Sequence, residues 1–356
     1  MISTSPPLRK RLNPNKGGAG SSTSGISASP PFNFSGGMAV REVRTAHIND
    51  AHISLPEKME NFVLTISFLL MGMCLRRLPH FPKGTAQVLN MFAMTLSLPA
   101  LVLLKVPQLH FSYDILTPIV MPWAMLTISA LIIIISGKLL CWEKETTGAL
   151  LLLIPLGNTS FFGIPMVQAF FGEAGVPYAV LYDQLGSFLA LATYGAVVVA
   201  LYGSGGKPTT KSVLTRIISF PPFIALILAF ACRSLAFPAP LLSLLNALAA
   251  TLVPLVMVAV GFQLSLRLSP EVIRPLGAGL IVKLAVAPLI ALVFCRLLGL
   301  DSLAARVSVF EAGMPPMVSA GALAIMAGLS PRLTAALIGL GIVFSFVTLP
   351  LLFRLL

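Results

Sequence analysis

The chain has 356 residues, of which 56% are hydrophobic and only 10% are charged, with a mean hydropathy of +0.93. A soluble domain does not need so much apolar surface, so the composition predicts a polytopic, all-α membrane protein that is surrounded by the lipid bilayer. The formal net charge of +12 does not predict a nucleic-acid partner, because the basic residues beyond position 58 lie mostly at the ends of apolar segments.

Residues 1–58 differ in composition from the rest of the chain. They are rich in Ser, Pro and Gly and contain no long apolar run, so we expect a disordered tail. Three interpretations of this tail stay open. It is an upstream-start artefact, which we favour because Met59 opens a stretch typical of a natural start, or a transit peptide, or a regulatory tail.

Ten apolar segments follow, and each is near the roughly 20 residues that cross a bilayer as a helix. We expect two domains of five helices each, 59–206 and 207–356. The expected transmembrane helices are 61–78, 86–105, 115–141, 147–171, 177–202, 216–235, 241–264, 272–298, 302–328 and 332–356.

The loops between these segments carry an orientation signal. Cytoplasmic loops of membrane proteins are enriched in Lys and Arg, which predicts that the loops after the odd-numbered segments face the cytoplasm and that both termini lie outside. We therefore expect a multi-pass protein of the plasma membrane, which in a bacterium is the inner membrane. The basic residues of these loops are Arg76, Arg77, Lys83, Lys138, Lys144, Lys207, Lys211, Arg216, Arg267, Arg274 and Arg332.

Two landmarks repeat between the halves of the chain. "SLPALVLL" resembles "TLVPLVMV", which aligns Pro99 with Pro254, and "GIPMV" resembles "GMPPMV", which aligns Gly163 with Gly313 at nearly the same offset. Five segments is an odd number, so the two halves must have opposite orientations. The sequence thus predicts an inverted repeat, in which matched Gly/Pro interruptions mark the binding site of a transporter.

The interruptions fall in the fourth and ninth segments. We expect Pro165 and the pair Pro315–Pro316 each to begin a second half-helix near the midplane, because proline is favoured at the first position of a helix. The N-terminus of a helix offers unpaired N–H groups and a partial positive charge. Two such ends would make an anion site. The predicted binding residues are Asn158, Thr159, Ser160, Gly163, Pro165, Gly313, Pro315 and Pro316.

Four more polar residues lie inside apolar segments. At about 1.5 Å per residue, Asn158, Lys283 and Glu311 reach depths of about 13–16 Å, near the midplane, whereas Asp183 lies at about 9 Å. We expect Lys283 and Glu311 to pair and Asp183 to carry a coupling proton, with Gln184 beside it. The alternatives are that Asn158 only bonds two helices together, that Lys283 extends toward the interface, and that Asp183 is solvated there.

"GNTSFFGIPMVQAFFG" followed by "LYDQLGSF", within ten spans, resembles the auxin efflux carrier family of permeases, whose bacterial members include malonate and other carboxylate transporters. The resemblance covers 59–356. It implies a fold similar to the sodium/proton antiporters and bile-acid symporters, with a scaffold of segments 1, 2, 6 and 7 through which a homodimer would form. Segments 3–5 and 8–10 would move, and segments 4 and 9 would cross at their prolines, where the substrate carboxylate binds.

The expected function is therefore a secondary carrier of small organic anions. The alternatives are an anion channel and an ion-coupled symporter or antiporter of another substrate class. An enzyme is disfavoured, because no nucleophile–base set, nucleotide-binding loop or metal-ligand spacing is present, and the four histidines lie outside the apolar runs. We expect no metal and no cofactor other than a coupling proton or sodium ion.

Overall fold

The protein is helical throughout the part that the structure describes, which contains no β-strand. Helix α2 begins at Leu55, inside the predicted tail, and the rest of that tail lies outside the described residues, as do Lys207 and Arg267. The computed structural model describes residues 55–109, 112–204, 209–235, 237–264 and 268–356.

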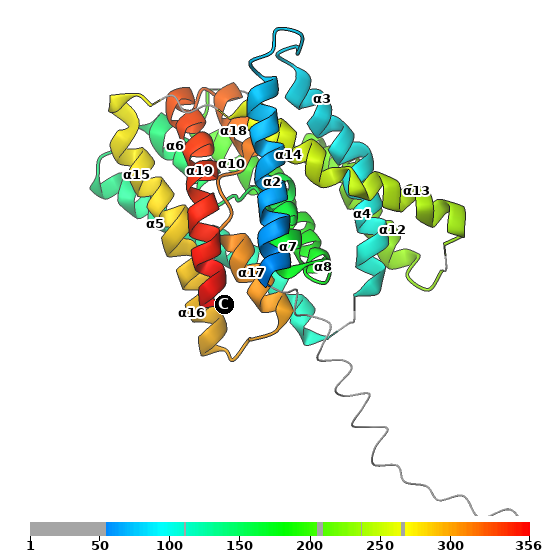
Figure 1. The fold of residues 1–356 in the computed structure, drawn as a ribbon. Coiled ribbons are helices and arrows are strands. Elements are labelled where there is room, and N and C mark those ends of the chain that lie inside the picture. The colour runs from blue at the N-terminus through cyan, green and yellow to red at the C-terminus, as the bar shows by residue number, and fades with distance from the viewer. Residues whose placement is uncertain (1–54, 110–111, 205–208, 236, 265–267) are drawn as a thin grey trace, which may run out of the picture. The chain divides into compact units, whose positions relative to one another are not determined.

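The first half of the chain alternates α-helices with π-helical turns, in which each N–H bonds to the carbonyl five residues before it (Figure 1). Such turns are frequent at functional sites. The α-helices are α2 (Leu55–Leu75), α3 (Thr85–Phe92), α4 (Leu98–Lys105), α5 (Leu116–Leu139), α6 (Lys144–Leu153), α7 (Ile164–Phe171), α8 (Val176–Leu181), α9 (Leu189–Ala192) and α10 (Tyr194–Tyr202). The π-turns are η1 (Ala93–Ser97), η4 (Thr159–Gly163) and η5 (Tyr182–Phe188).

The second half is built in the same manner. Proline at the first helical position, where a missing N–H costs no bond, begins α12 and α19. The elements are α11 (Thr210–Ile218), α12 (Pro221–Ala231), α13 (Ala239–Ala250), α14 (Leu252–Gln263), α15 (Ile273–Ile281), the π-turn η7 (Val282–Val286), α16 (Ala287–Leu297), α17 (Leu303–Ala312), α18 (Val318–Met326) and α19 (Pro331–Leu355).

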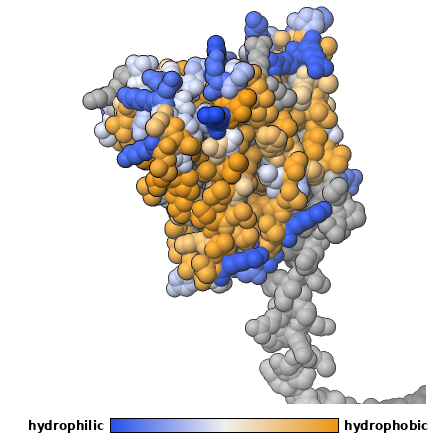
Figure 2. Space-filling model, turned by 90° about the vertical axis from the view of Figure 1, so that its left-hand side faces the viewer, coloured by the Kyte–Doolittle hydropathy of each residue, from blue (hydrophilic) through white to orange (hydrophobic). Residues whose placement is uncertain are grey.

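Several helices are suited to a membrane. Within the described residues, six are long and apolar enough to cross one. Figure 2 shows a hydrophobic band on the viewed face, with hydrophilic residues gathered at its upper and lower edges. The protein is therefore embedded in a membrane through several spans. The six helices are Thr85–Gln108, Tyr113–Leu139, Val176–Tyr202, Ala239–Gln263, Pro270–Leu297 and Pro331–Leu355.

The other four expected spans are shorter or interrupted. The fourth is divided between α6 and α7, and the ninth between α17 and α18. In the first and sixth, the apolar helices are only Glu60–Leu75 and Pro221–Ala231. A helix needs roughly 20 apolar residues to cross the hydrocarbon core. The continuous apolar part of each of these four segments is shorter than that, although α2 as a whole has 21 residues.

The helices pack as two groups that each draw on both halves of the sequence. The first group comprises α2, α3, α4, α12, α13 and α14, in which α2 and α3 lie on α14, and α4 lies on α12 and α13. The second group comprises α5–α10 and α15–α19. Figure 1 shows α3, α4, α12 and α13 at one side and α5, α6, α15 and α16 at the other. The groups meet where α2 contacts α7, α14 contacts η4, and α4 contacts α8.

Two glycines let the backbones of α2 and α14 approach closely. A Cβ at Gly72 would collide with the Val258 carbonyl of α14, and a Cβ at Gly261 would collide with the Leu69 carbonyl of α2. Small residues at such crossings are typical of packing between membrane helices, because lipid tails leave packing and hydrogen bonds as the main forces. These glycines therefore hold the first group together.

Candidate functional site

The interruptions of the fourth and ninth segments lie against each other. Gly157 and Pro316 form an isolated antiparallel bridge. The Asn158 N–H donates to the Pro315 carbonyl at 2.8 Å, and the Met317 N–H donates to the Leu156 carbonyl at 3.1 Å. The two non-helical stretches thus satisfy each other's backbone groups, which membrane-embedded chains must do without water. Because neither proline is a donor in this bridge, their missing N–H groups cost it nothing.

The second half-helix of the fourth segment begins earlier than expected. The helix runs continuously over Thr159–Phe171, with Asn158 as its N-cap and the Gly163 N–H bonded to the Asn158 carbonyl at 2.9 Å. The prediction that Pro165 begins this half-helix is therefore wrong, because Pro165 follows the complete π-turn η4. The free N–H groups at this end belong to Thr159 and the residues after it.

The ninth segment also differs in detail. Pro315 and Pro316 lie in the non-helical stretch, and α18 begins at Val318 with Met317 as its N-cap. The prolines precede the half-helix instead of opening it, because a residue before proline is pushed toward an extended conformation. Gly313 is the C-cap of α17, where a Cβ would lie 2.8 Å from the Leu352 side chain.

Asp183 contacts the start of the half-helix at the crossing. Its Oδ1 accepts from the Thr159 and Ser160 hydroxyls at 2.5 Å each, and its Oδ2 accepts from Gln184 Nε2 at 2.6 Å. Its side chain is 1% exposed. The hydroxyls that bind it belong to the start of the half-helix, so Asp183 contacts the crossing. Its depth of about 9 Å stays a prediction. Sequence reasoning named both partners but not this contact between the fourth and fifth segments.

Glu311 is buried against the π-turn η4. It is 0% exposed, and neither carboxylate oxygen has a hydrogen-bond partner. A Cβ at Gly163 would lie 2.8 Å from Glu311 Oε1. Gly163 is thus required because the Glu311 carboxylate occupies the space where any other residue would place its side chain.

Lys283 approaches the crossing from the π-turn η7. Its Nζ donates to the Ala312 carbonyl at 3.4 Å and would lie 3.2 Å from a Cβ at Gly157. Both Lys283 and Glu311 are described, and no ion pair within 4 Å joins them. The predicted ion pair between Lys283 and Glu311 is therefore not formed, although the two residues line one cavity.

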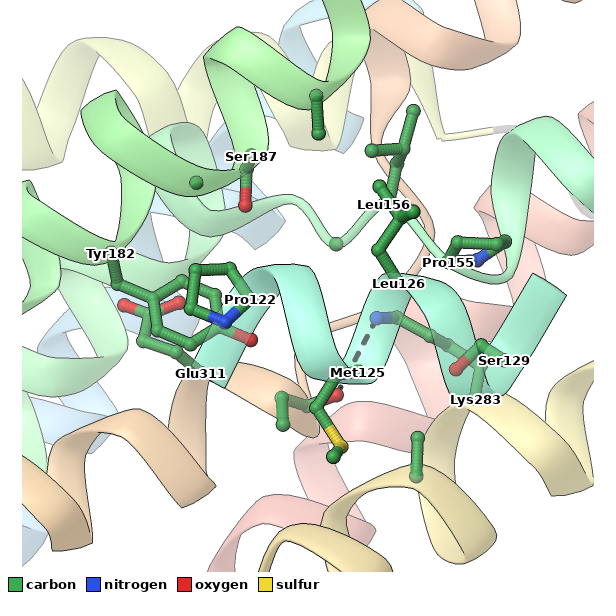
Figure 3. A pocket seen from close by; sticks show the side chains of 15 residues that line it. Pro122, Met125, Leu126, Ser129, Pro155, Leu156, Tyr182, Ser187, Lys283 and Glu311 are labelled. Carbon is green, nitrogen blue, oxygen red and sulfur yellow. Dashed lines mark hydrogen bonds between the residues drawn. The ribbon is translucent and has the colours of Figure 1, made fainter. Parts of the chain in front are cut away.

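Figure 3 shows that cavity, with Glu311 beside Tyr182 and Pro122 and with the Lys283 amine joined to a backbone oxygen. The cavity leaves only about 10 Å³ for the centre of a water-sized sphere, which is about enough for one water molecule. Sequence reasoning missed Pro122, Ser129 and Tyr182 in its wall. A proline inside a helix and a serine in an apolar run were the available signals, but each occurs often without a function.

Two polar atoms beside the crossing also lack partners. Asn158 Nδ2 and Gln184 Oε1 are buried without a hydrogen bond, in side chains that are 2% and 0% exposed. Leaving such a group unpaired costs about 1–3 kcal/mol. The amide of Asn158 is thus a donor that a ligand with acceptor oxygens would satisfy.

A second, larger cavity lies between the two helix groups. The space available to the centre of a water-sized sphere is about 620 Å³ in this cavity. Its walls come from α2, α4, α7, α13 and α14 and include Pro165 and Pro254. At this cavity Lys105, at the end of α4, forms a 2.6 Å ion pair with Glu173, in the loop after α7. This ion pair joins the first group to the second.

The chain matches the Membrane transport protein family over residues 59–353. It is 27% identical over 307 residues to an uncharacterized transporter of Methanocaldococcus jannaschii, which covers 82% of this chain and 97% of the relative. It is 26% identical over 297 residues to an uncharacterized transporter of Methanothermobacter thermautotrophicus, which covers 82% of this chain and 96% of that relative. These matches point to a transporter and not to an enzyme.

The matched residues begin at Met59 and contain the whole helical part from α3 to α18, including both interruptions. The resemblance to the auxin efflux carriers is confirmed at the level of the family. The chain belongs to the Membrane transport protein family and is a multi-pass membrane transporter.

Proposed function

We propose that this transporter is a secondary carrier of small organic anions, such as mono- or dicarboxylates, which bind where the two interrupted segments cross. The observation that carries the proposal is the unpartnered, buried amide donor of Asn158 at the start of the helix Thr159–Phe171. A carboxylate would accept from this amide and from the free N–H groups of the first helical turn, where the helix dipole favours negative charge.

Lys283 adds a positive charge to the same place. Its amine lies against Gly157, at the bridge between the two segments, and its single hydrogen bond of 3.4 Å to a carbonyl is long. A lysine ammonium has three donors, so two remain for a ligand. Lys283 is thus the counter-charge that makes the crossing suitable for an anion despite the nearby carboxylate of Asp183.

The two helix groups supply the moving parts of an alternating-access mechanism. We assign the first group as the scaffold and the second as the moving domain, with both termini outside and the two sequence halves as inverted repeats. The cavity at the crossing is too small for a carboxylate, so this conformation is closed around the site. A homodimer would form through the scaffold, and a proton or a sodium ion would drive the cycle.

Binding tests the anion site directly. The purified protein is heated in the presence of acetate, malonate and succinate, and we expect at least one of them to raise its unfolding temperature. Asn158→Asp should abolish this stabilisation, because a second negative charge in a water-poor site repels the ligand. Asn158→Ala, which only removes the donor, should weaken it less.

Gln87→Glu is the matched control, because Gln87 is exposed on α3 and lines neither the cavity at the crossing nor the cavity between the two helix groups. It should leave the stabilisation unchanged. Stabilisation of Asn158→Asp equal to that of the parent would contradict the anion site, and the interrupted helices would then serve a cation or a hinge. Counterflow in proteoliposomes separates a carrier from a channel, because only a carrier exchanges labelled for unlabelled substrate with saturation.

A further inference from the structure

The crossing contains two buried carboxylates whose surroundings differ. Asp183 accepts hydrogen bonds from three side chains, and both of its oxygens have donors. Hydrogen bonds to an ionised acceptor are about twice as strong as those between neutral groups. Its donors come from both the half-helix and its own π-turn, so the surroundings of Asp183 hold it in place and favour its ionised form over that of a carboxylate without donors.

Glu311 has no such support. Both of its oxygens are buried without a donor, and its side chain is 0% exposed. An isolated ionised carboxylate costs far more to bury than a neutral carboxylic acid. The same buried site therefore stabilises the charge of Asp183 by hydrogen bonds and leaves the charge of Glu311 without any.

The groups around Glu311 do not change this difference. Asp183 and Tyr182 face it from η5, Lys283 faces it from η7, and all three are its electrostatic neighbours. The wall from α5 consists of Pro122, Met125, Leu126 and Ser129, none of which ionises in the physiological range. The backbone of Gly163 lies against the carboxylate from η4. The one cation, Lys283, bonds to the Ala312 carbonyl instead.

We propose that Glu311, and not Asp183, is the exchangeable proton site of this transporter, and that it is protonated when the crossing binds an anion. The proposal rests on the proposed function for its link to the anion, but the proton site itself does not. With Glu311 protonated, the charges of Lys283 and Asp183 cancel. With Glu311 ionised, the site carries one net negative charge beside the place where the anion must bind.

The sign of the pH dependence follows from this charge count. Protonation of Glu311 removes the net negative charge, so anion affinity rises as pH falls. By linkage, anion binding in turn strengthens proton binding at Glu311 by the same factor. Proton and anion then cross together, the proton being taken from water on one side and returned to water on the other. For one linked proton, affinity changes by at most about tenfold per pH unit.

Infrared spectroscopy of the reconstituted full chain tests the proton site without any substrate. At neutral pH the wild type should show the carbonyl stretch of a buried, protonated carboxylic acid. Glu311→Gln, which imitates the neutral acid in size, should lack this band at every pH. Asp183→Asn should retain it but only at lower pH, because loss of the Asp183 charge leaves Lys283 to favour the ionised form of Glu311. Glu271→Gln, at an exposed ion pair with Arg332, is the matched control and should leave the band unchanged.

Gly163→Ala is an independent variant, because its added Cβ would lie 2.8 Å from Glu311 Oε1. It should shift the frequency of the band without removing it. A wild type without the band, or a band lost in Asp183→Asn and kept in Glu311→Gln, overturns the proposal.

The link to the anion is read in the thermal-shift series with acetate, malonate and succinate at several pH values. The wild type should bind more tightly as pH falls through the range in which the infrared band grows, and Glu311→Gln should bind with an affinity that does not change over that range. If anion affinity depends on the sodium concentration and not on pH, the site binds sodium, and the proposal of a proton site is overturned. If the infrared band behaves as expected but none of the three anions binds, the proposed function fails while the proton site stands.

Discussion

Asp183 joins the fourth and fifth segments of the chain by side-chain hydrogen bonds. The hydroxyls of Thr159 and Ser160, from the start of one half-helix, both donate to the same oxygen of a carboxylate in another span. A carboxylate in this position holds the π-turn η5 against η4. The same contact brings the charge of Asp183 close to the proposed anion site. Asp183 therefore holds two segments together and also affects the electrostatic potential at that site.

Removing one donor should therefore destabilise the protein. We expect Ser160→Ala to lower the free energy of unfolding by about 1.5–3 kcal/mol, the range for a hydrogen bond to a charged group. Ser67→Ala is the control, because Ser67 is exposed on α2 and donates only to the Val63 carbonyl of its own helix. The measurement is thermal unfolding in detergent. An equal decrease in stability for the two variants would show that the bond to Asp183 contributes no more than an exposed bond within one helix.

Lys283 and Glu311 should act independently of each other. Lys283→Met leaves the Ala312 carbonyl without its donor, which costs about 1–3 kcal/mol. Because Glu311 is neutral in the proposed protonated state and glutamine imitates that state, the substitution removes no charge that Lys283 interacts with, and the double variant with Glu311→Gln should equal the sum of the single variants within about 0.5 kcal/mol. A larger coupling energy in this double-mutant cycle would indicate a charge pair that forms in solution.

At the scale of elements, the important feature is that the interruptions support each other. Each non-helical stretch donates one backbone bond to the other, so neither half of the crossing is stable without its counterpart. Asp183, Lys283 and the residues of η4 also lie in π-turns, which widen the helix locally and redirect side chains. The polar site is therefore assembled from irregular backbone that only protein contacts make tolerable in a membrane.

The close packing of α2 on α14 gives a prediction for the first group. Gly261→Ala should destabilise the protein by about 1–3 kcal/mol, the range for overpacking, because the added Cβ meets a backbone carbonyl that cannot rotate away. Gly277→Ala is the matched control in α15, where nothing lies within 4 Å of the added Cβ. It should be neutral or stabilise by about 0.5–1 kcal/mol, as expected for removing a helical glycine. Similar unfolding temperatures for both variants would contradict the close approach.

At the scale of the whole described unit, the ion pair between Lys105 and Glu173 crosses from one helix group to the other. If the groups move relative to each other, this contact must break in every transport cycle. Its place beside the cavity between the groups makes it a suitable position for a crosslink.

We expect Lys105→Cys combined with Glu173→Cys to transport normally when reduced and to stop when a mercury ion bridges the two thiols. The control pair, Glu271→Cys with Arg332→Cys, joins two positions at an ion pair of 2.9 Å near the ends of α15 and α19, both in the second group. It should transport equally well with and without the bridge. Uptake of a carboxylate that stabilises the wild type is the measurement, and full uptake by the bridged first pair would show that the groups do not separate there.

The sequence by itself determined the membrane class, the helical structure and the place of the interruptions, because these follow from composition and from Gly and Pro positions that act locally. It also named Asn158, Thr159, Ser160, Asp183, Lys283 and Glu311. Only the tertiary structure decided how they meet. Counting residues along a straight helix did not predict that Asp183 contacts the hydroxyls of Thr159 and Ser160, and equal depth suggested a contact between Lys283 and Glu311 that is not formed.

The reason is that residue counting gives only the depth of a residue along the membrane normal, whereas a contact also depends on where its helix lies and which way the side chain points. Whether a carboxylate accepts three hydrogen bonds, as Asp183 does, or none, as Glu311 does, depends on the rotation of each helix and on the π-turns that alter it. The start of the half-helix at Thr159, instead of Pro165, was decided in the same way, because the backbone bond from Asn158 to Pro315 ends the interruption there. Such a bond joins residues far apart in the chain and leaves no local signature in the sequence.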